Sequence, residues 1–216
     1  FYRLCWGGED IHIGHYARGD ETVADASAAM TQFLIQEACI EAGQNVLDVA
    51  CGFGGTLRTL ARLGCHAEGI DISEICVAEA ISANRAAGSD DQIKVSLGDF
   101  HNIDSPSDNW DAVICQESLI HSHDRPRVFA EIFRVLRPGG VFVFSDILTS
   151  ERADLALVEA AFARLGAAVG ATVQDYCDMA CAAGFDIVHV QERQGDIKTH
   201  YDKLAPVLDR QGRGLG

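Results

Sequence analysis

The stretch NVLDVACGFGGT (residues 45–56) joins an apolar run to a glycine loop. The run at 45–51 predicts a buried strand, and a helix predicted at 56–64 follows the loop directly. Gly52 and Gly54 allow a sharp turn and let a ligand approach the main chain closely. The first N–H groups of the helix are then open to an anion. A loop of this kind also occurs as a simple tight turn, so its meaning depends on the rest of the chain.

Apolar runs alternate with amphipathic stretches on both sides of this loop. Further strands are predicted at 66–72, 93–99, 110–117, 141–148 and 185–193, and further helices at 22–42, 73–88, 124–140, 151–166 and 172–183. Ser73, Asp124 and Thr172 are the expected N-caps of three of these helices. The unbroken apolar character of 141–148 predicts a strand that is buried on both faces. The pattern indicates an α/β fold with a doubly wound, mostly parallel sheet, in which ligands bind at the carboxyl ends of the strands.

Composition narrows the possible partners. The chain has 216 residues, 48% of them hydrophobic, and a formal net charge of −15. This charge argues against nucleic acid and anionic membrane, because both attract clustered Lys and Arg. No apolar run approaches the roughly 20 residues of a membrane span. None of the eight cysteines forms a CxxC pair, so free thiols in the cytoplasm are expected, with no metal site. The sequence indicates no oligomeric state.

Acidic residues follow the second and third predicted strands. Asp71 lies about 20 residues beyond the glycine loop, where an acid suits a ribose diol. After the next strand, Asp99 can accept a hydrogen bond from an adenine amino group and Phe100 can flank the ring. Each acid taken alone also suits a helix cap or a solvated loop. A dinucleotide fingerprint fails, because Leu57 stands where its third glycine is required. Together these positions outline a nucleoside with an anionic tail.

The segments VLDVACGFGGT, GIDIS, LGDF and VLRPGGVFVFSD, in this order, resemble the S-adenosylmethionine-dependent methyltransferases of the Rossmann-like class, over residues 45–148. The resemblance implies S-adenosylmethionine as cofactor, S-adenosylhomocysteine as product and no metal. The implied cofactor-binding residues are Asp48, Gly52, Gly54, Asp71, Ile72, Asp99, Phe100 and Gln116. The class usually has seven strands, whereas six are predicted here, so the seventh is expected to be missing or barely begun.

The opening segment FYRLCWGGEDIHIG is similar to that of the sarcosine and dimethylglycine N-methyltransferases, which complete the synthesis of the osmoprotectant glycine betaine. A more distant similarity is to phosphoethanolamine and tocopherol methyltransferases. The resemblance implies a lid segment, defined here as residues 1–21, that folds over the cofactor. It places Ile11, His12 and Gly14 at the methionine end and Tyr2 and Trp6 at the acceptor. The alternative is a surface arm packed by its aromatic residues.

Candidate acceptor residues follow the fourth and sixth predicted strands. Glu117 and His121 are four residues apart and share a face if they lie on a helical turn. Phosphoethanolamine methyltransferases carry Asp and His at this spacing near the accepting nitrogen, so both are candidate catalytic residues, His121 for proton transfer or orientation. The alternative is a polar surface loop. Further candidates for the acceptor pocket are His15, Tyr16, His200 and Tyr201.

The sequence predicts one domain over 1–216. It comprises the lid segment 1–21, a cofactor-binding core at 22–148, and acceptor-side helices and last strands at 149–216. The leading hypothesis is N-methylation of sarcosine or N,N-dimethylglycine, small-molecule amines, in the cytoplasm. A phosphoethanolamine-like amine or another small molecule is the alternative acceptor. A nicotinamide-dependent oxidoreductase and a cofactor-binding module without activity are the competing classes.

Overall fold

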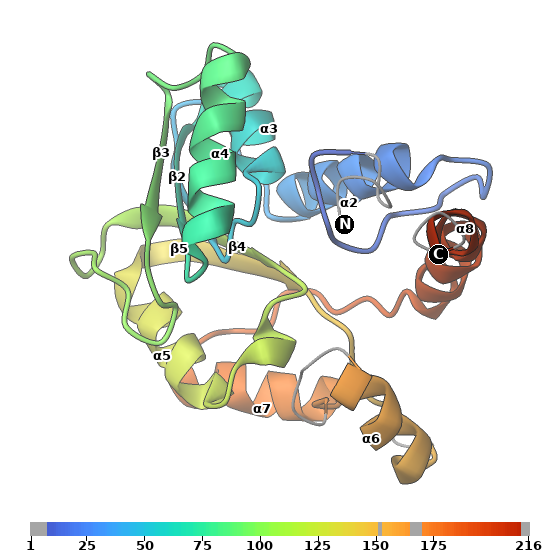
Figure 1. The fold of residues 1–216 in the computed structure, drawn as a ribbon. Helices are drawn as coiled ribbons and strands as arrows, with labels where there is room; N and C mark the ends of the chain where they lie inside the picture. The colour runs from blue at the N-terminus through green and yellow to red at the C-terminus, as the bar shows by residue number, and fades with distance from the viewer. Residues whose placement is uncertain (1–7, 151–152, 165–169, 213–216) are drawn as a thin grey trace.

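A computed structural model describes residues 8–150, 153–164 and 170–212. Its centre is a five-stranded sheet with the order β3-β2-β1-β4-β5, and every pair of neighbours is parallel (Figure 1). The strands are β1 (Asn45–Val49), β2 (His66–Asp71), β3 (Ile93–Leu97), β4 (Trp110–Gln116) and β5 (Leu136–Ser145). The order reverses between β1 and β4, so the topological switch point lies where these two strands end.

Helices cover both faces of the sheet (Figure 1). They are α2 (Val23–Glu37), α3 (Gly55–Leu63), α4 (Glu74–Ala86), the 3-10 helix η1 (Leu119–His121), α5 (Arg125–Val135), α6 (Leu155–Arg164), α7 (Val173–Ala183) and α8 (Gln194–Gly212). The predicted N-caps are confirmed: Ser73, Asp124 and Thr172 each accept a hydrogen bond from the backbone three residues on. The doubly wound α/β architecture is therefore as expected, with all five strands parallel.

The core divides into two clusters, one on each face of the sheet. Side chains alternate along β1, so Leu47 and Val49 face α5 and α7, whereas Val46 faces α2 and α3. Phe129 of α5 and Leu57 of α3 are fully buried on opposite faces. Each such side chain contributes about 1.5–3 kcal/mol through burial. The two clusters hold the carboxyl ends of β1 and β4 in place.

The boundary between α5 and β5 differs from the prediction. The helix expected over 124–140 ends at Val135, and β5 begins at Leu136, so Pro138 and the glycines after it lie within the strand. The pairing of β4 with β5 is irregular here, with a register shift that accommodates the extra residues. Residues 142–148 are half-buried rather than buried on both faces, because β5 is an edge strand.

The strand predicted at 185–193 is wrong, because these residues have no regular secondary structure. Their alternating apolar pattern suits a strand, but they pair with none of the described strands, and Val188 is 95% exposed. The described residues thus contain five strands rather than six. His200 and Tyr201 consequently lie on α8 and not after a strand. None of the described helices is long and apolar enough to cross a membrane.

Candidate functional site

The glycine loop links β1 to α3 at the switch point. Gly52 (φ 52°) and Gly54 (φ 77°) both adopt left-handed backbone conformations, which favour glycine. Gly54 is the N-cap residue of α3 and makes no side-chain cap. A Cβ atom at Gly54 would lie 3.1 Å from Arg58 and 3.3 Å from Ala80. The left-handed backbone and the close neighbours therefore explain why position 54 is a glycine. The first N–H groups of α3 have no side-chain cap.

Asp71, at the end of β2, holds the neighbouring loops. Its Oδ2 atom accepts a hydrogen bond from the Gly52 N–H at 2.9 Å, and its Oδ1 atom accepts one from the Ser73 N–H at 2.8 Å. The carboxylate is buried. This places the predicted ribose-binding acid beside the glycine loop and gives it a structural role there as well.

The predicted adenine-binding residues lie along the same edge. Ile72, directly after Asp71, is 75% exposed, which is unusual for so large an apolar side chain. Asp99 is half-exposed and accepts hydrogen bonds from the backbone N–H (2.9 Å) and the Nδ1 atom (2.7 Å) of His101. Burial opposes its ionisation, but these bonds outweigh it and lower the pKa of Asp99. The Phe100 ring lies 4.8 Å from that of His101.

Asp48 lies on β1 beneath the loop and is buried. Burial raises the pKa of this carboxyl well above its usual range, and the nearby Asp10 and Asp71 raise it further. A proton on Asp48 therefore relieves repulsion among the three acids. Cys51, in the loop itself, is also buried, and burial raises the pKa of its thiol, so that it remains neutral.

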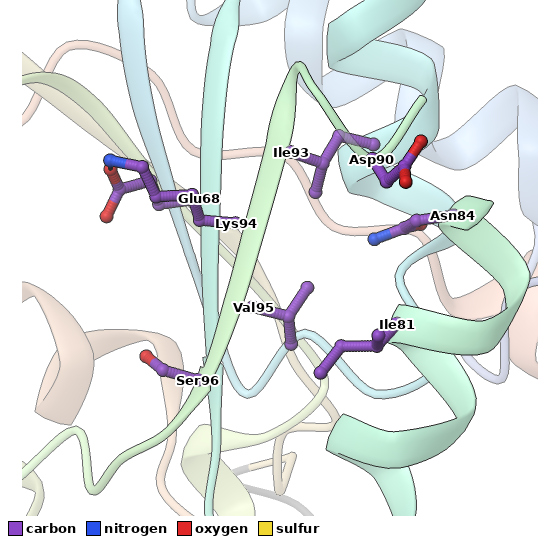
Figure 2. Close-up of a pocket in the computed structure, with 8 residues that line it drawn as sticks. All are labelled: Glu68, Ile81, Asn84, Asp90, Ile93, Lys94, Val95 and Ser96. Atoms are coloured by element: carbon purple, nitrogen blue, oxygen red, sulfur yellow. Dashed lines mark hydrogen bonds and ion pairs between the residues drawn. The ribbon is translucent and has the colours of Figure 1, made fainter. Parts of the chain in front are cut away.

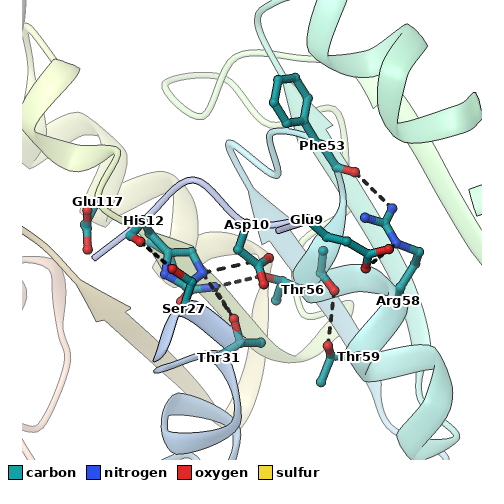
Figure 3. A network of polar contacts seen from close by, with 12 residues as sticks. Glu9, Asp10, His12, Ser27, Thr31, Phe53, Thr56, Arg58, Thr59 and Glu117 are labelled. Carbon is teal, nitrogen blue, oxygen red and sulfur yellow. Dashed lines mark hydrogen bonds and ion pairs between the residues drawn. The ribbon is translucent and has the colours of Figure 1, made fainter. Parts of the chain in front are cut away.

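The lid segment is described from residue 8 to residue 21. Its residues Glu9 and Asp10 lie beside the start of α3, where the glycine loop ends (Figure 3). The Ile11 side chain approaches Gly52 so closely that a Cβ atom there would lie 3.7 Å away. Arg58 of α3 is 1% exposed, and its Nε atom donates to Glu9 at 2.9 Å. Asp10 packs against Gly55, the first residue of α3. Its carboxylate thus lies at the positive end of the helix dipole.

Two further lid residues are enclosed. His12 is buried, and its Nε2 atom lies 3.2 Å from the Thr31 hydroxyl of α2. Gly14 packs on α2 so tightly that a Cβ atom would lie 2.4 Å from that of Ala26. The Gly14 N–H also donates to the Nδ1 atom of His200 at 3.2 Å. A side chain at position 14 would therefore push the lid segment away from α2.

The remaining lid candidates meet α8. The Tyr16 hydroxyl lies 2.9 Å from the Nδ1 atom of His200, and the Tyr16 N–H donates to Asp196 at 3.1 Å. Burial raises the pKa of Tyr16 to about 12 and lowers that of His200 to about 4. His15 contacts Arg193, which lies just before α8. These predicted acceptor residues hold the lid segment and α8 together, whereas Tyr201 is half-exposed on α8. Tyr2 and Trp6 lie outside the described residues.

Glu117 and His121 lie where the chain leaves β4. Glu117 has a left-handed backbone (φ 51°), which is uncommon for a residue with a side chain. Its Oε1 atom accepts the Ile13 N–H at 2.7 Å, so it ties the lid segment to β4. Burial raises the pKa of Glu117 to about 8. His121 ends the 3-10 helix with an exposed side chain, and partial desolvation lowers its pKa.

The sequence analysis missed two groups at this edge. Asp146 follows β5, and the pairing of Gln116 with Ser145 puts it beside Glu117. It accepts a hydrogen bond from the Tyr176 hydroxyl of α7, and burial raises its pKa to about 7. Thr31 is buried on α2 and bonded to both His12 and Gln116. No local pattern marks these residues, because their partners come from distant parts of the chain.

The side chains at this edge of the sheet fit the chemical groups of S-adenosylmethionine. An exposed Ile72 offers an apolar face to a purine, and Asp71 offers carboxylate oxygens to a diol. The Oε1 atom of Gln116 is buried without a hydrogen-bond partner among the described residues, so it can accept a further N–H. Among those residues, no group of three or more His, Cys, Asp or Glu side chains is arranged to hold a metal ion.

A separate pocket of about 430 Å³ lies between β3 and α4 (Figure 2). Ile81, Ile93 and Val95 contribute its apolar lining, and Glu68 and Lys94 pair with each other beside it. It contains none of the predicted site residues. Its lining comes from β2, β3 and α4 and from the loop before β3 rather than from the carboxyl ends of the strands.

Comparisons with known proteins agree with this geometry. A family described as "Methyltransferase domain" matches residues 46–140. A dimethylglycine N-methyltransferase from Parasynechococcus marenigrum is 34% identical over 94% of this chain and 74% of its own length. A sarcosine/dimethylglycine N-methyltransferase from Halorhodospira halochloris is 31% identical over 97% and 76%. A crystal structure of a candidate sarcosine dimethylglycine methyltransferase from Galdieria sulphuraria superposes with a TM-score of 0.91, with 27% identity over 99% of this chain and 83% of the other.

Proposed function

The chain belongs to the S-adenosylmethionine-dependent methyltransferases, and we propose that it methylates the nitrogen of sarcosine and N,N-dimethylglycine toward glycine betaine. One observation carries the choice of acceptor. The relatives named for these amines match 94% and 97% of the chain and also 74% and 76% of their own lengths. Methyltransferases named for another acceptor match 88% and 95% of the chain but only 51% and 54% of their own lengths. This mutual coverage supports the amines as acceptors.

In this proposal the cofactor lies across the carboxyl ends of β1, β2 and β3. Gly52, Gly54 and Asp48 face its methionine part, Asp71 its ribose, and Ile72, Asp99 and Phe100 its adenine. Ile11, His12 and Gly14 cover it from the lid segment. The exposed apolar surface of Ile72 and the position of Ile11 over Gly52 support this arrangement.

When bound, the cofactor supplies a sulfonium methyl group, and the nitrogen lone pair forms the new N–C bond as the C–S bond breaks and its electron pair stays on sulfur. The protein must present a nitrogen that has lost its proton, because an aliphatic ammonium has no lone pair. In this proposal Glu117 and His121 take or orient that proton. Once the proton is removed, alignment of the two substrates by the lid segment supplies most of the rate. The rings of Tyr2, Trp6, Tyr16 and Tyr201 are candidates to stabilise the cationic product.

The proposal divides the chain by role. The lid segment closes the site, residues 22–148 bind the cofactor, and residues 149–216 complete the acceptor side. The hydrogen bonds of Gly14 and Tyr16 to α8 support this division, because they join the first and last parts around one site. Free thiols at the described cysteines support a reducing compartment such as the cytoplasm.

A methyl-transfer assay tests the proposal. Purified protein is incubated with S-adenosylmethionine and, in turn, glycine, sarcosine, N,N-dimethylglycine and phosphoethanolamine, and methylated products and S-adenosylhomocysteine are measured by mass spectrometry. We expect sarcosine and dimethylglycine to give glycine betaine in step with S-adenosylhomocysteine. Heat-treated protein and a reaction without amine are the controls. Exclusive methylation of phosphoethanolamine would overturn the acceptor assignment and keep the family.

A further inference from the structure

Thr31 belongs to a polar network that no sequence motif marks, and Figure 3 shows its contact with His12. It is buried on α2, with a single hydroxyl between two partners. On one side its Oγ1 atom lies 3.2 Å from Nε2 of His12 in the lid segment. On the other side it accepts a hydrogen bond of 3.3 Å from Nε2 of Gln116 at the end of β4. The lid segment and β4 are thus joined through one side chain of a third element.

The directions of these hydrogen bonds follow from the chemistry of the end groups. His12 Nδ1 lies 3.2 Å from the Ile13 carbonyl oxygen, which can only accept, so Nδ1 carries the hydrogen. Burial lowers the pKa of His12 and so favours the neutral ring, while the Asp10 carboxylate, 3.8 Å from Nε2, acts in the opposite direction. In the neutral ring with its hydrogen on Nδ1, the Nε2 atom accepts from the Thr31 hydroxyl. The lone pairs of that hydroxyl are then left to accept from Gln116.

This order fixes the orientation of the Gln116 amide. One N–H of Gln116 goes to Thr31, and the other goes to the Thr56 hydroxyl at 2.7 Å. Both donors are therefore used, and the Oε1 atom points away from both threonines. It is buried, with no hydrogen-bond partner among the described residues. A buried acceptor left without a donor destabilises the protein, so it indicates a donor that arrives with a ligand.

We propose that Thr31 is a positioning residue that couples the lid segment to ligand binding, by holding Gln116 so that its Oε1 atom accepts a hydrogen bond from an ammonium N–H of the bound ligand. The inference rests on the proposed function, in which two groups carry such an N–H. One is the α-ammonium group of the cofactor's methionine part, and the other is the acceptor amine. Both belong at the carboxyl end of β4, where the switch point lies.

A double-mutant cycle tests the coupling. Thr31→Val keeps the shape of the side chain and removes the hydroxyl, and Gln116→Leu removes the amide. Binding of S-adenosylhomocysteine, and of sarcosine to the protein loaded with it, is measured by calorimetry for each variant and for the double variant. We expect each single change to weaken at least one of these ligands about tenfold, and the double variant to be no weaker than Gln116→Leu alone. Thr31→Ser restores binding.

The matched control is Thr59→Val. Thr59 lies on the neighbouring helix α3, and its hydroxyl donates to the Gly55 carbonyl and accepts from Arg62, both on its own helix. Losses that add in the double variant, or single variants that bind both ligands like wild type, would overturn the proposal. If Thr31→Val fails to fold, Thr31→Ala replaces it in the cycle.

The two ligands also separate the sources of the ammonium group. If the cofactor supplies it, Gln116→Leu no longer distinguishes S-adenosylhomocysteine from an analogue without the α-amino group. If the acceptor supplies it, that distinction persists and only sarcosine binding falls. A protein that binds no sarcosine at all would contradict the proposed function, whereas the cycle with S-adenosylhomocysteine would still report on Thr31.

Discussion

Replacing Asp71 by Ala or Asn separates the role that the structure shows for this carboxylate from the role that we propose for it. In the free protein it accepts N–H groups from Gly52 and Ser73 at 2.9 and 2.8 Å. In the proposed complex it also accepts hydrogen bonds from the ribose hydroxyls. The first role stabilises the loops, and the second stabilises the ligand, so the two are measured by different experiments.

The magnitudes differ enough to be distinguished. Hydrogen bonds to a charged group contribute roughly 1.5–3 kcal/mol each, and a tenfold change in affinity needs only about 1.4 kcal/mol. Loss of the ribose contacts in Asp71→Ala should therefore weaken S-adenosylhomocysteine binding at least about tenfold. Loss of the loop contacts should lower the melting temperature by about 2–4 °C for each kcal/mol, as expected for a chain of this size. Asp71→Asn keeps one oxygen and should show a smaller loss in both.

Isothermal calorimetry with S-adenosylhomocysteine and thermal unfolding of the free protein measure the two roles. Glu68→Gln is the matched control, because it removes one acid from the same strand, where the carboxylate pairs with Lys94. Its affinity should equal that of wild type. If Asp71→Ala melts earlier but binds S-adenosylhomocysteine within twofold of wild type, then Asp71 only holds the loops, and the assignment to ribose is refuted.

If His121 moves the proton, His121→Ala should lower turnover about 10²-fold or more at saturating amine and leave S-adenosylhomocysteine affinity unchanged. A normal rate would show that His121 is an ordinary loop residue. The control is His123→Ala, at a neighbouring exposed position. Since burial raises the pKa of Glu117 to about 8 from 4.5, the unfolding free energy of wild type should fall as pH rises between these values, because the unfolded chain releases this proton first. Glu117→Gln should lack this part of the slope in urea titrations, and parallel slopes would show an ordinary carboxyl. Proteolytic removal of residues 1–16 should abolish methyl transfer while the sheet stays folded; an unchanged rate with dimethylglycine would make this segment only an arm.

The places of the glycine loop and of Asp71 in the fold were predictable, because they follow local patterns. Gly52 and Gly54 come shortly after β1, Asp71 ends β2, and strand ends can be located from the apolar runs in the sequence. The network around Thr31 was not predictable, because Gln116 lies 85 residues away and nothing near Thr31 in sequence distinguishes it from an ordinary helical threonine.

The two wrong predictions of secondary structure also arise from contacts between distant parts of the chain. Residues 185–193 alternate like a strand, but a strand forms only where a neighbour can satisfy its backbone, and these residues pair with no described strand. At Pro138, local rules predict a break between helix and strand, whereas the pairing of Leu136 with Trp110 already draws the chain into the sheet. In both places tertiary pairing overrides the local preference.

The hydrogen bond between Gly14 and His200 spans 186 positions of the chain. During synthesis, the sheet at 45–145 can therefore fold while the lid segment still has no α8 to close against. The glycine loop and Asp71 are made before α8 is. If they bind the cofactor as proposed, an unfinished chain binds it in an open site, without the contacts that join the lid segment to α8. In the proposed arrangement, the ability to align the two substrates therefore appears only after α8 has been made.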